Sequence, residues 1–451
     1  MDRHMMKRCV AFAAAAWLAG AGMASAQIGG QAGGFASSAE LEQVFQQLLA
    51  DPANPELTLR YARLAVEAGN SEAAVAALER LVLFNDTLPR ARIELGVLYY
   101  RLGSHAQARD YLKRGLADPS LPADARANGE RYLAEVENML SPHVLEGSLT
   151  MGFRYQTNAN LAPSGRRVLQ AGLPFNLPRN QRKQDDGNFF GLLGVEHKYD
   201  FDPFDRQAWL ESDFTLYGAK QFERSRLDLM VADFATGPRF QPLPGDLPGL
   251  NMKPFFRASV AVLDEQEYFH SFGFGLSNRL DLSERLRLEA GYEFRALDYN
   301  STSRRPFADE QSGIENNLAV GARYLITPSQ RLEFRLGGRL MDAKKGYESF
   351  DEISTSLTYQ IGYSAPFAGM PQWIAAVFAG YAHSWYDRPD RSVAPGRTRD
   401  DDEWRIGAYN VFNLNKDWSA LALIEYVEND SNIRNFDYND LSVMLGLTRR
   451  F

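Results

Sequence analysis

The spacing of apolar residues divides the chain into a helical part and a strand part. From about residue 39 to residue 140, apolar residues recur at helical spacing in a segment rich in Ala, Leu, Glu and Arg. From Val144 to Phe451 the period changes to two, and residues 285–296 alternate between apolar and charged side chains without a slip. Because strands place successive side chains on opposite faces, this predicts a helical domain at 39–140 and a β-domain at 144–451.

The helical part contains an internal repeat of 34 residues. The recurring positions are Pro55 and Pro89, Gly69 and Gly103, Ala74 and Ala108, and Leu78 and Leu112. Ala62 and Gly96, also 34 apart, are small residues where two paired helices would touch. This pattern resembles the tetratricopeptide repeat, in which helix pairs stack into a solenoid. We expect two repeats with flanking helices at about 39–51 and 122–140; an unrelated helical bundle is the alternative.

A stacked repeat array presents one side of each first helix in a concave groove, a common place for a peptide or partner. The residues expected on that side are Leu59, Arg63, Val66, Arg90, Ile93, Val97, Tyr100 and Arg101. Arginine and tyrosine are frequent anchors of protein interfaces. Arg63, Arg90, Tyr100 and Arg101 are therefore candidate client-binding residues, with an ordinary solvated helix face as the alternative.

The strand part has the pattern of a transmembrane barrel, whose outer face meets lipid while its lumen is wet. It divides into about fourteen strands of ten or more residues, an even number. Tight connections at 203–205, 283–284, 327–329 and 415–417 alternate with long polar ones at 158–186, 300–310, 388–402 and 429–439. The last strand ends in Phe451, which resembles the signal that barrel-assembly machinery reads. A soluble sandwich is the alternative, although it rarely combines so many charges on one face with so many aromatic residues on the other.

The same alternation assigns side chains to the lumen or to lipid. The lipid-facing set includes Leu288, Tyr292 and Phe294, and the candidate lumen lining is Arg287, Glu289, Glu293, Arg295, Glu333 and Arg335. Pairs within a strand, such as Glu289 with Arg287 and Glu333 with Arg335, either form a selectivity lining or simply neutralise one another. The 158–186 connection is rich in arginine, so we expect it to fold inward or to meet a partner.

Composition and charge narrow the class of protein. The chain has 451 residues, 24% of them charged, with a mean hydropathy of −0.35, and after the N-terminus it lacks an apolar run of membrane-helix length. This excludes a multi-span helical membrane protein, and the formal charge of −8 argues against a nucleic-acid binder. Residues 1–26 are predicted to be a signal peptide and 27–38 a flexible lead-in. Cys9, the only cysteine, lies in that signal, so disulfides are not expected.

The sequence carries no recognisable catalytic or metal-binding motif. The six histidines are far apart, and the nucleophile-elbow, phosphate-loop and dinucleotide patterns are missing. We therefore expect no enzymatic activity, no cofactor and no metal site. An outer-membrane protease or lipase, whose acid and base residues meet only in three dimensions, is the alternative.

The overall layout resembles the surface lipoprotein assembly modifier (Slam) family, the outer-membrane translocons of type XI secretion. The stretch Tyr155-Gln156-Thr157-Asn158-Ala159-Asn160-Leu161-Ala162-Pro163 is similar to the aromatic, N-x-N and Ala-Pro stretch after that family's first barrel strand. The resemblance implies a monomer that moves a client lipoprotein or secreted protein across the outer membrane, with a periplasmic helical domain and no catalytic residues. A polysaccharide exporter, or a porin-like channel with a periplasmic helical domain, is the alternative.

Overall fold

The computed structural model describes residues 38–85, 88–201 and 208–451. The predicted signal peptide at 1–26 lies outside the described residues, and so does the predicted lead-in except for Ser38. The described chain forms two compact units, a helical one that ends at Pro142 and a β-unit that begins at His143. Among the described residues, no helix is long and apolar enough to cross a membrane.

The helical unit consists of helix pairs that repeat. Its described residues form the helices α2 (Ser38–Ala50), α3 (Pro55–Glu67), α4 (Ser71–Phe84), α5 (Pro89–Arg101), α6 (His105–Leu116) and α7 (Ala123–Met139). Pro55 and Pro89 begin α3 and α5, where a missing N–H costs nothing. Gly69 and Gly103 turn the chain within each pair at φ values of 80° and 77°, which glycine adopts readily. The predicted tetratricopeptide-like solenoid is thus confirmed, with α2 and α7 flanking the two pairs.

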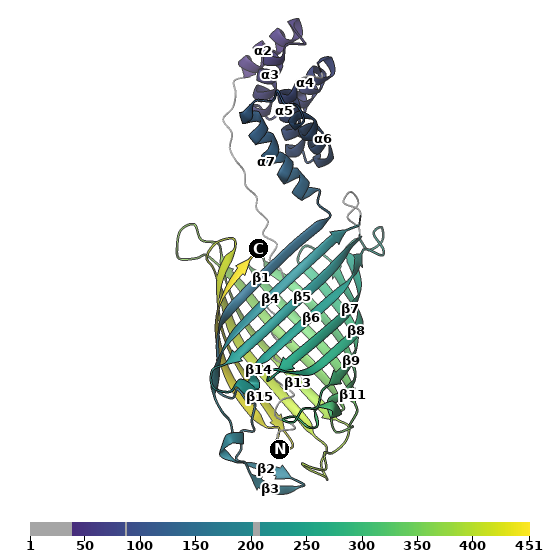
Figure 1. The fold of residues 1–451 in the computed structure, drawn as a ribbon, viewed down its shortest axis with the longest axis vertical. Coiled ribbons are helices and arrows are strands. Elements are labelled where there is room, and N and C mark those ends of the chain that lie inside the picture. The colour runs from purple at the N-terminus through teal and green to yellow at the C-terminus, as the bar shows by residue number, and fades with distance from the viewer. Residues whose placement is uncertain (1–37, 86–87, 202–207) are drawn as a thin grey trace. The chain divides into compact units, whose positions relative to one another are not determined.

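The β-unit is a closed antiparallel barrel, shown in Figure 1. Its fourteen strands within the described residues are β1 (His143–Gln156), β4 (Asp186–Asp200), β5 (Ala208–Gln221), β6 (Leu229–Phe240), β7 (Leu250–Leu263), β8 (Gln266–Asp281), β9 (Leu286–Tyr299), β10 (Gly313–Thr327), β11 (Gln330–Ala343), β12 (Phe350–Tyr363), β13 (Trp373–Tyr386), β14 (Asp400–Asn413), β15 (Trp418–Ser431) and β16 (Tyr438–Arg450). Each strand pairs with its sequence neighbour, and β1 also pairs with β16. The ring has no free edge strand, as a membrane barrel requires, and the predicted fold is confirmed.

The two ends of the barrel differ in their connections. We call the end where β1 begins and β16 finishes the turn end, and the opposite end the loop end. The predicted long connections lie at the loop end, where the first one also contains a hairpin of β2 (Arg167–Gln170) and β3 (Leu173–Asn176). The alternation of lengths is incomplete, because 241–249 and 364–372 are long connections at the turn end. Conversely, Asp264 and Glu265 turn β7 into β8 at the loop end with φ values of 57° and 62°, which allows a two-residue turn. The tight connection predicted at 203–205 lies outside the described residues.

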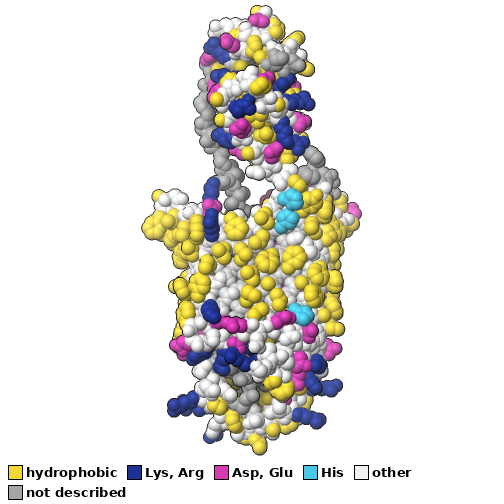
Figure 2. Space-filling view, in the orientation of Figure 1, with side chains coloured by type: hydrophobic (Ala, Val, Ile, Leu, Met, Phe, Trp, Pro, Cys, Tyr) yellow, Lys and Arg dark blue, Asp and Glu magenta, His cyan; other side chains and the backbone are white. Residues whose placement is uncertain are grey.

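The outer face of the barrel is apolar and the inner face is polar. On β9, Leu288 and Tyr292 are 36% and 46% exposed on the outside, and the alternating charged residues Arg287, Glu289 and Glu293 face inward. Figure 2 shows hydrophobic side chains in a belt across the visible face of the barrel, with charged side chains gathered toward the loop end. Exposed aromatic residues lie near both ends, for example Trp385 and Trp404 at the loop end and Trp418 at the turn end. An apolar belt between aromatic girdles around a wet lumen belongs to a barrel of the bacterial outer membrane.

The terminal residue closes the barrel seam. Phe451 N–H donates to Gly147 O at 3.0 Å, and Gly147 N–H donates to Phe451 O at 2.8 Å. The Phe451 ring lies against Gly147 so closely that a Cβ there would come within 2.4 Å of it. The side chain of Phe451 thus packs directly on the first strand at Gly147.

Candidate functional site: the barrel lumen and its cap

The lumen wall is braced by ion pairs that run across strands. Glu211 on β5 accepts from Arg239 on β6 at 2.7 Å and from Lys253 on β7 at 2.9 Å. Lys253 also contacts Asp213 at 2.7 Å, and both cations are nearly buried. Buried charges are tolerated only when they are paired. If one partner is removed, the other stays buried without a compensating charge, and the protein loses stability. This part of the wall is therefore rigid and close to neutral.

A second network crosses the wall from β6 to β12. Its contacts are Arg257 with Asp233 (3.4 Å) and Glu293 (2.7 Å), Arg295 with Glu293 (3.7 Å) and Glu315 (3.9 Å), and Arg339 with Glu315 (3.9 Å) and Glu352 (2.9 Å). Each of these three arginines is shared by two carboxylates. The lumen therefore carries both signs of charge, with acidic groups in local excess on this side.

The residues that the sequence assigned to the lumen lie on inward-facing positions, but they pair differently. Arg287 contacts Asp281 at 2.5 Å, and Glu289 lies 4.0 Å from Arg323. Glu333 contacts Arg323 at 2.9 Å and Arg331 at 2.8 Å rather than Arg335. The pairs proposed within a strand, Glu289 with Arg287 and Glu333 with Arg335, are thus replaced mostly by pairs between strands. Antiparallel pairing brings side chains on neighbouring strands closer together than i and i+2 on one strand.

The sequence motif after β1 forms a buried lock between the first connection and the last strand. The Asn158 side chain donates to Ala162 O at 2.9 Å and to Asn439 O at 3.0 Å, and it accepts from Ala162 N–H at 3.0 Å. Asn158 N–H donates to the buried Asp440 carboxylate at 2.8 Å. Asn160 bridges the far side of the same connection through Arg182 O and Gln184 N–H. Both asparagines are essentially unexposed, so the N-x-N pattern is a structural requirement of this loop.

The locked connection enters the loop end of the lumen and joins two other connections. We call the segments 157–185, 387–399 and 432–437 the cap. Leu161 packs against Val427 and Tyr438 on the inner wall, which shows that the connection folds inward as expected. The β2–β3 hairpin meets the other two connections through backbone bonds from Ala171 to Ser392 O (2.8 Å) and through the Asn435 side chain.

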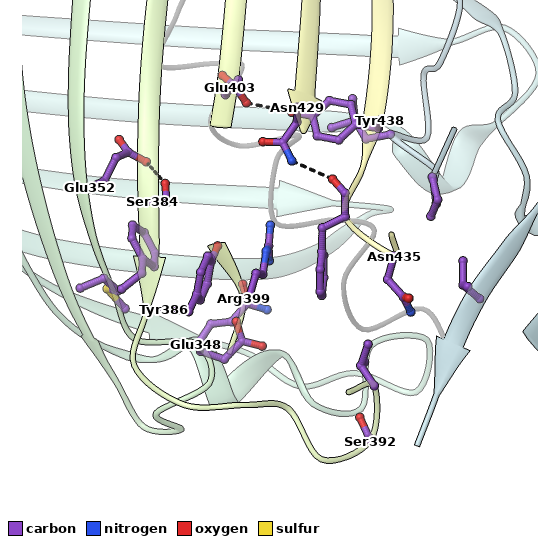
Figure 3. Close-up of a pocket in the computed structure, with 18 of the residues that line it drawn as sticks. Glu348, Glu352, Ser384, Tyr386, Ser392, Arg399, Glu403, Asn429, Asn435 and Tyr438 are labelled. Atoms are coloured by element: carbon purple, nitrogen blue, oxygen red, sulfur yellow. Dashed lines mark hydrogen bonds between the residues drawn. The ribbon is translucent and has the colours of Figure 1, made fainter. Parts of the chain in front are cut away.

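A cavity of about 520 Å³ lies between the cap and the inner wall (Figure 3). The cap lines it with apolar side chains and with the polar side chains of Gln170, Gln181, Ser392, Arg399 and Asn435, while the wall contributes aromatic, amide and carboxylate groups. Arg399 lies over the Phe436 ring at 3.7 Å and the Tyr386 ring at 4.4 Å, and it pairs with the buried Asp401. The mixed lining of this cavity suits a small molecule.

The packing of the helical unit shows that part of the predicted groove is wrong, because some of its residues are buried. Ile93 and Val97 are 1% and 5% exposed, because they pack with α7 side chains such as Val136 in one apolar core. Tyr100 is half-buried beside Tyr132, and its hydrogen bond to Glu135 raises the pKa of its hydroxyl. The α5 face is thus covered by α7, which the spacing of the repeats did not predict.

The arginines of the predicted groove remain at the surface of the helical unit. Arg63 and Arg101 are exposed, and Arg90 lies 3.7 Å from Asp124. These three side chains lie at the surface, whereas Tyr100 serves the packing of α5 on α7.

Two groups of residues were not found from the sequence. The cavity is built from cap and wall residues far apart in the chain, so no local motif marks it. His383 lies between two carboxylates on the outer face at the loop end, with Nδ1 2.8 Å from Asp402 and Nε2 3.4 Å from Asp400. The pairing of β13 with β14 brings these residues together. Each imidazole nitrogen faces a carboxylate, which is the arrangement of a hydrogen-bonded surface cluster.

Comparisons with known proteins add little to this geometry. No family model and no curated protein matches the chain. Among solved structures, a bacterial polysaccharide outer membrane secretin is 10% identical over 68% of this chain and 98% of its own, with a TM-score of 0.35. An anion-selective porin from Comamonas acidovorans is 12% identical over 68% and 99%, also with a TM-score of 0.35. The TPR domain of P58(IPK) is 21% identical over 31% and 33%, with a TM-score of 0.21. At these identities the function has to be inferred from the barrel's own residues.

Proposed function

We propose that this protein is an outer-membrane translocon that moves specific lipoproteins or secreted proteins to the cell surface. The observation that carries the proposal is the role of the segment from Tyr155 to Pro163. This segment resembles the Slam motif, and its asparagines hold the cap in the lumen through buried hydrogen bonds. The residues that carry the resemblance therefore also have a structural role, which is to hold the cap in the lumen.

The rest of the molecule is consistent with a gated protein path. The cap occupies the loop end of the lumen, which is the position expected of a gate that opens only for a client. A helical repeat unit with exposed arginines suits capture of a protein on the periplasmic side. The mixed-charge wall does not favour a polymer of one sign, which makes a dedicated exporter of an acidic polysaccharide the weaker alternative.

A reversible tether of the cap tests the proposal. Ala171 N–H donates to Ser392 O at 2.8 Å, so the two backbones lie side by side, and Cys9 in the predicted signal is the only native cysteine. We would introduce Ala171→Cys with Ser392→Cys and verify the cross-link by gel migration. The assay is co-expression with a lipoprotein encoded by a neighbouring gene, followed by protease shaving of intact cells.

The oxidised tether should abolish surface display of the client, and a reductant should restore it. Each single-cysteine variant serves as a control for the substitutions themselves. Because the cross-link joins two segments of the cap, display at the wild-type level by the cross-linked protein would contradict a path that opens by their separation. A change in surface glycan without a change in any lipoprotein would favour the exporter.

A further inference from the structure

We propose that the cavity between the cap and the wall binds a small organic ammonium compound with an aromatic or aliphatic body. The proposal rests on the lining of the cavity, and it does not depend on the transport role. Three properties of the lining lead to it. Two buried amide oxygens accept no hydrogen bond from the described residues, carboxylates are in excess, and the surrounding surface is apolar.

Asn429 provides the first of these properties. Its side chain is completely buried on β15, and its Nδ2 donates to Phe436 O at 2.8 Å. A backbone carbonyl only accepts hydrogen bonds, so this contact fixes the orientation of the amide. The Asn429 Oδ1 then accepts no hydrogen bond from the described residues, and Figure 3 shows it pointing away from Phe436 into the open space. A buried acceptor without a donor is costly, so a ligand that donates there is favoured.

A second buried acceptor lies on the cap side of the same cavity. The Gln181 Oε1 is also buried and accepts no hydrogen bond from the described residues. Two hydroxyl donors of the wall are already used, since Ser384 donates to Glu352 at 3.0 Å and Tyr438 donates to Glu403 at 2.9 Å. Tyr299 and Tyr386, which also carry hydroxyl groups, line the cavity too. Each of the two buried amide oxygens favours a ligand that donates a hydrogen bond to it.

The charge of the lining selects the sign of that ligand. Four carboxylates line the cavity, on Glu315, Glu348, Glu352 and Glu403, together with the guanidinium groups of Arg339 and Arg399. Asp401 neutralises Arg399, Arg405 pairs with Glu403 at 3.2 Å, and Arg339 is shared by Glu315 and Glu352, so five carboxylates face three guanidinium groups. Negative charge is thus in excess. An ammonium group supplies both the donors and the compensating charge, and hydrogen bonds between charged partners are the stronger ones.

The apolar part of the lining determines the size and polarity of the rest of the ligand. Leu297, Met341 and Phe350 on the wall face apolar cap residues such as Leu177 across the cavity. The volume of about 520 Å³ falls in the usual range for small-molecule sites, which are mostly apolar with a few placed polar groups. An ammonium on a ring or short aliphatic body fits this description, whereas a metal ion or a long polymer does not.

Three probes with one ring skeleton test the proposal in the full-length protein folded in detergent. Tyramine carries an ammonium, tyrosol is neutral, and 4-hydroxyphenylacetate is an anion. Isothermal titration should show saturable binding of tyramine, about tenfold weaker binding of tyrosol, and the weakest binding for the anion. Absence of saturable tyramine binding, or equal affinity for the anion, would overturn the proposal.

Matched variants locate the binding. Asn429→Leu should weaken tyramine binding about tenfold through loss of one hydrogen bond to a charged donor. Asn188→Leu is the control, since Asn188 is 2% exposed and also has an unpartnered Oδ1, but it lies on β4 outside the cavity. Equal weakening by both variants would contradict the assignment. If Asn429→Leu fails to fold, as judged by heat-modifiable migration, Glu352→Gln decides: it should reduce the preference for tyramine over tyrosol, and an unchanged preference would overturn the site.

Discussion

Replacement of Asn158 by leucine should release the cap while leaving the barrel intact. The Asn158 side chain makes three hydrogen bonds, to Ala162 O, to Asn439 O and from Ala162 N–H; the two with Ala162 are buried and the one to Asn439 O is partly buried. Leucine has a similar size and removes all of them. At about 1 kcal/mol for each hydrogen bond, the free energy of cap opening should fall by about 3 kcal/mol. Since 1.4 kcal/mol corresponds to a factor of ten, the open population should rise about 100-fold.

Trypsin provides the assay, because the first connection contains several basic residues. Its cleavage sites are Arg166, Arg167, Arg179, Arg182 and Lys183. When opening and closing are fast relative to cleavage, the cleavage rate follows the open population, so it should rise about 100-fold in Asn158→Leu. The barrel strands should stay uncut, and heat-modifiable migration should be unchanged.

The matched control is Asn176→Leu, the same substitution at an exposed position of the β2–β3 hairpin. It should cleave at the wild-type rate because it removes no buried contact. Equal cleavage rates for Asn158→Leu and Asn176→Leu would refute the lock, since they would mean that the buried bonds of Asn158 do not hold the connection.

Further predictions concern the barrel faces, the orientation, the helical unit and the groove. Leu318, on the outer face of β10, is 58% exposed, so Leu318→Arg should lower the free energy of unfolding in lipid vesicles by about 2–4 kcal/mol. Ala319→Arg, which faces the lumen, should lower it less, and equal losses would contradict the register. On intact cells, a tag in 388–402 should be accessible and a tag in 88–120 should not; the reverse would overturn the orientation. Burial and a 2.5 Å hydrogen bond to Glu79 raise the pKa of Tyr99 to about 12, so its contribution to stability is complete below about pH 10 and lost as the pH rises toward 12. Denaturation monitored by helical circular dichroism should show a larger loss in the wild type than in Tyr99→Phe, in which Tyr100 and Tyr111, whose pKa values are also raised, still contribute. Finally, Arg63→Glu with Arg101→Glu should reduce capture of the client without affecting barrel assembly; wild-type display would exclude both arginines from recognition.

Local patterns in the sequence determined the elements of this protein and the faces of its strands. The period of two placed Leu288 and Tyr292 on one side of β9 and its charges on the other, because successive side chains of a strand alternate whatever the strand pairs with. The 34-residue repeat predicted the helix pairs, since Gly69 and Gly103 meet the same backbone requirement in each.

Only the tertiary structure decided which residues meet. Glu333 on β11 contacts Arg323 on β10 because the strand register places them opposite each other, and a strand's own sequence does not contain its register. The covering of Ile93 by α7 likewise depends on the packing of a neighbouring helix. The cavity joins Gln181 to Asn429, which are almost 250 residues apart in the chain. The contacts around the cavity depend on closure of the whole barrel, because the first connection packs on an inner wall that exists only once the barrel is closed.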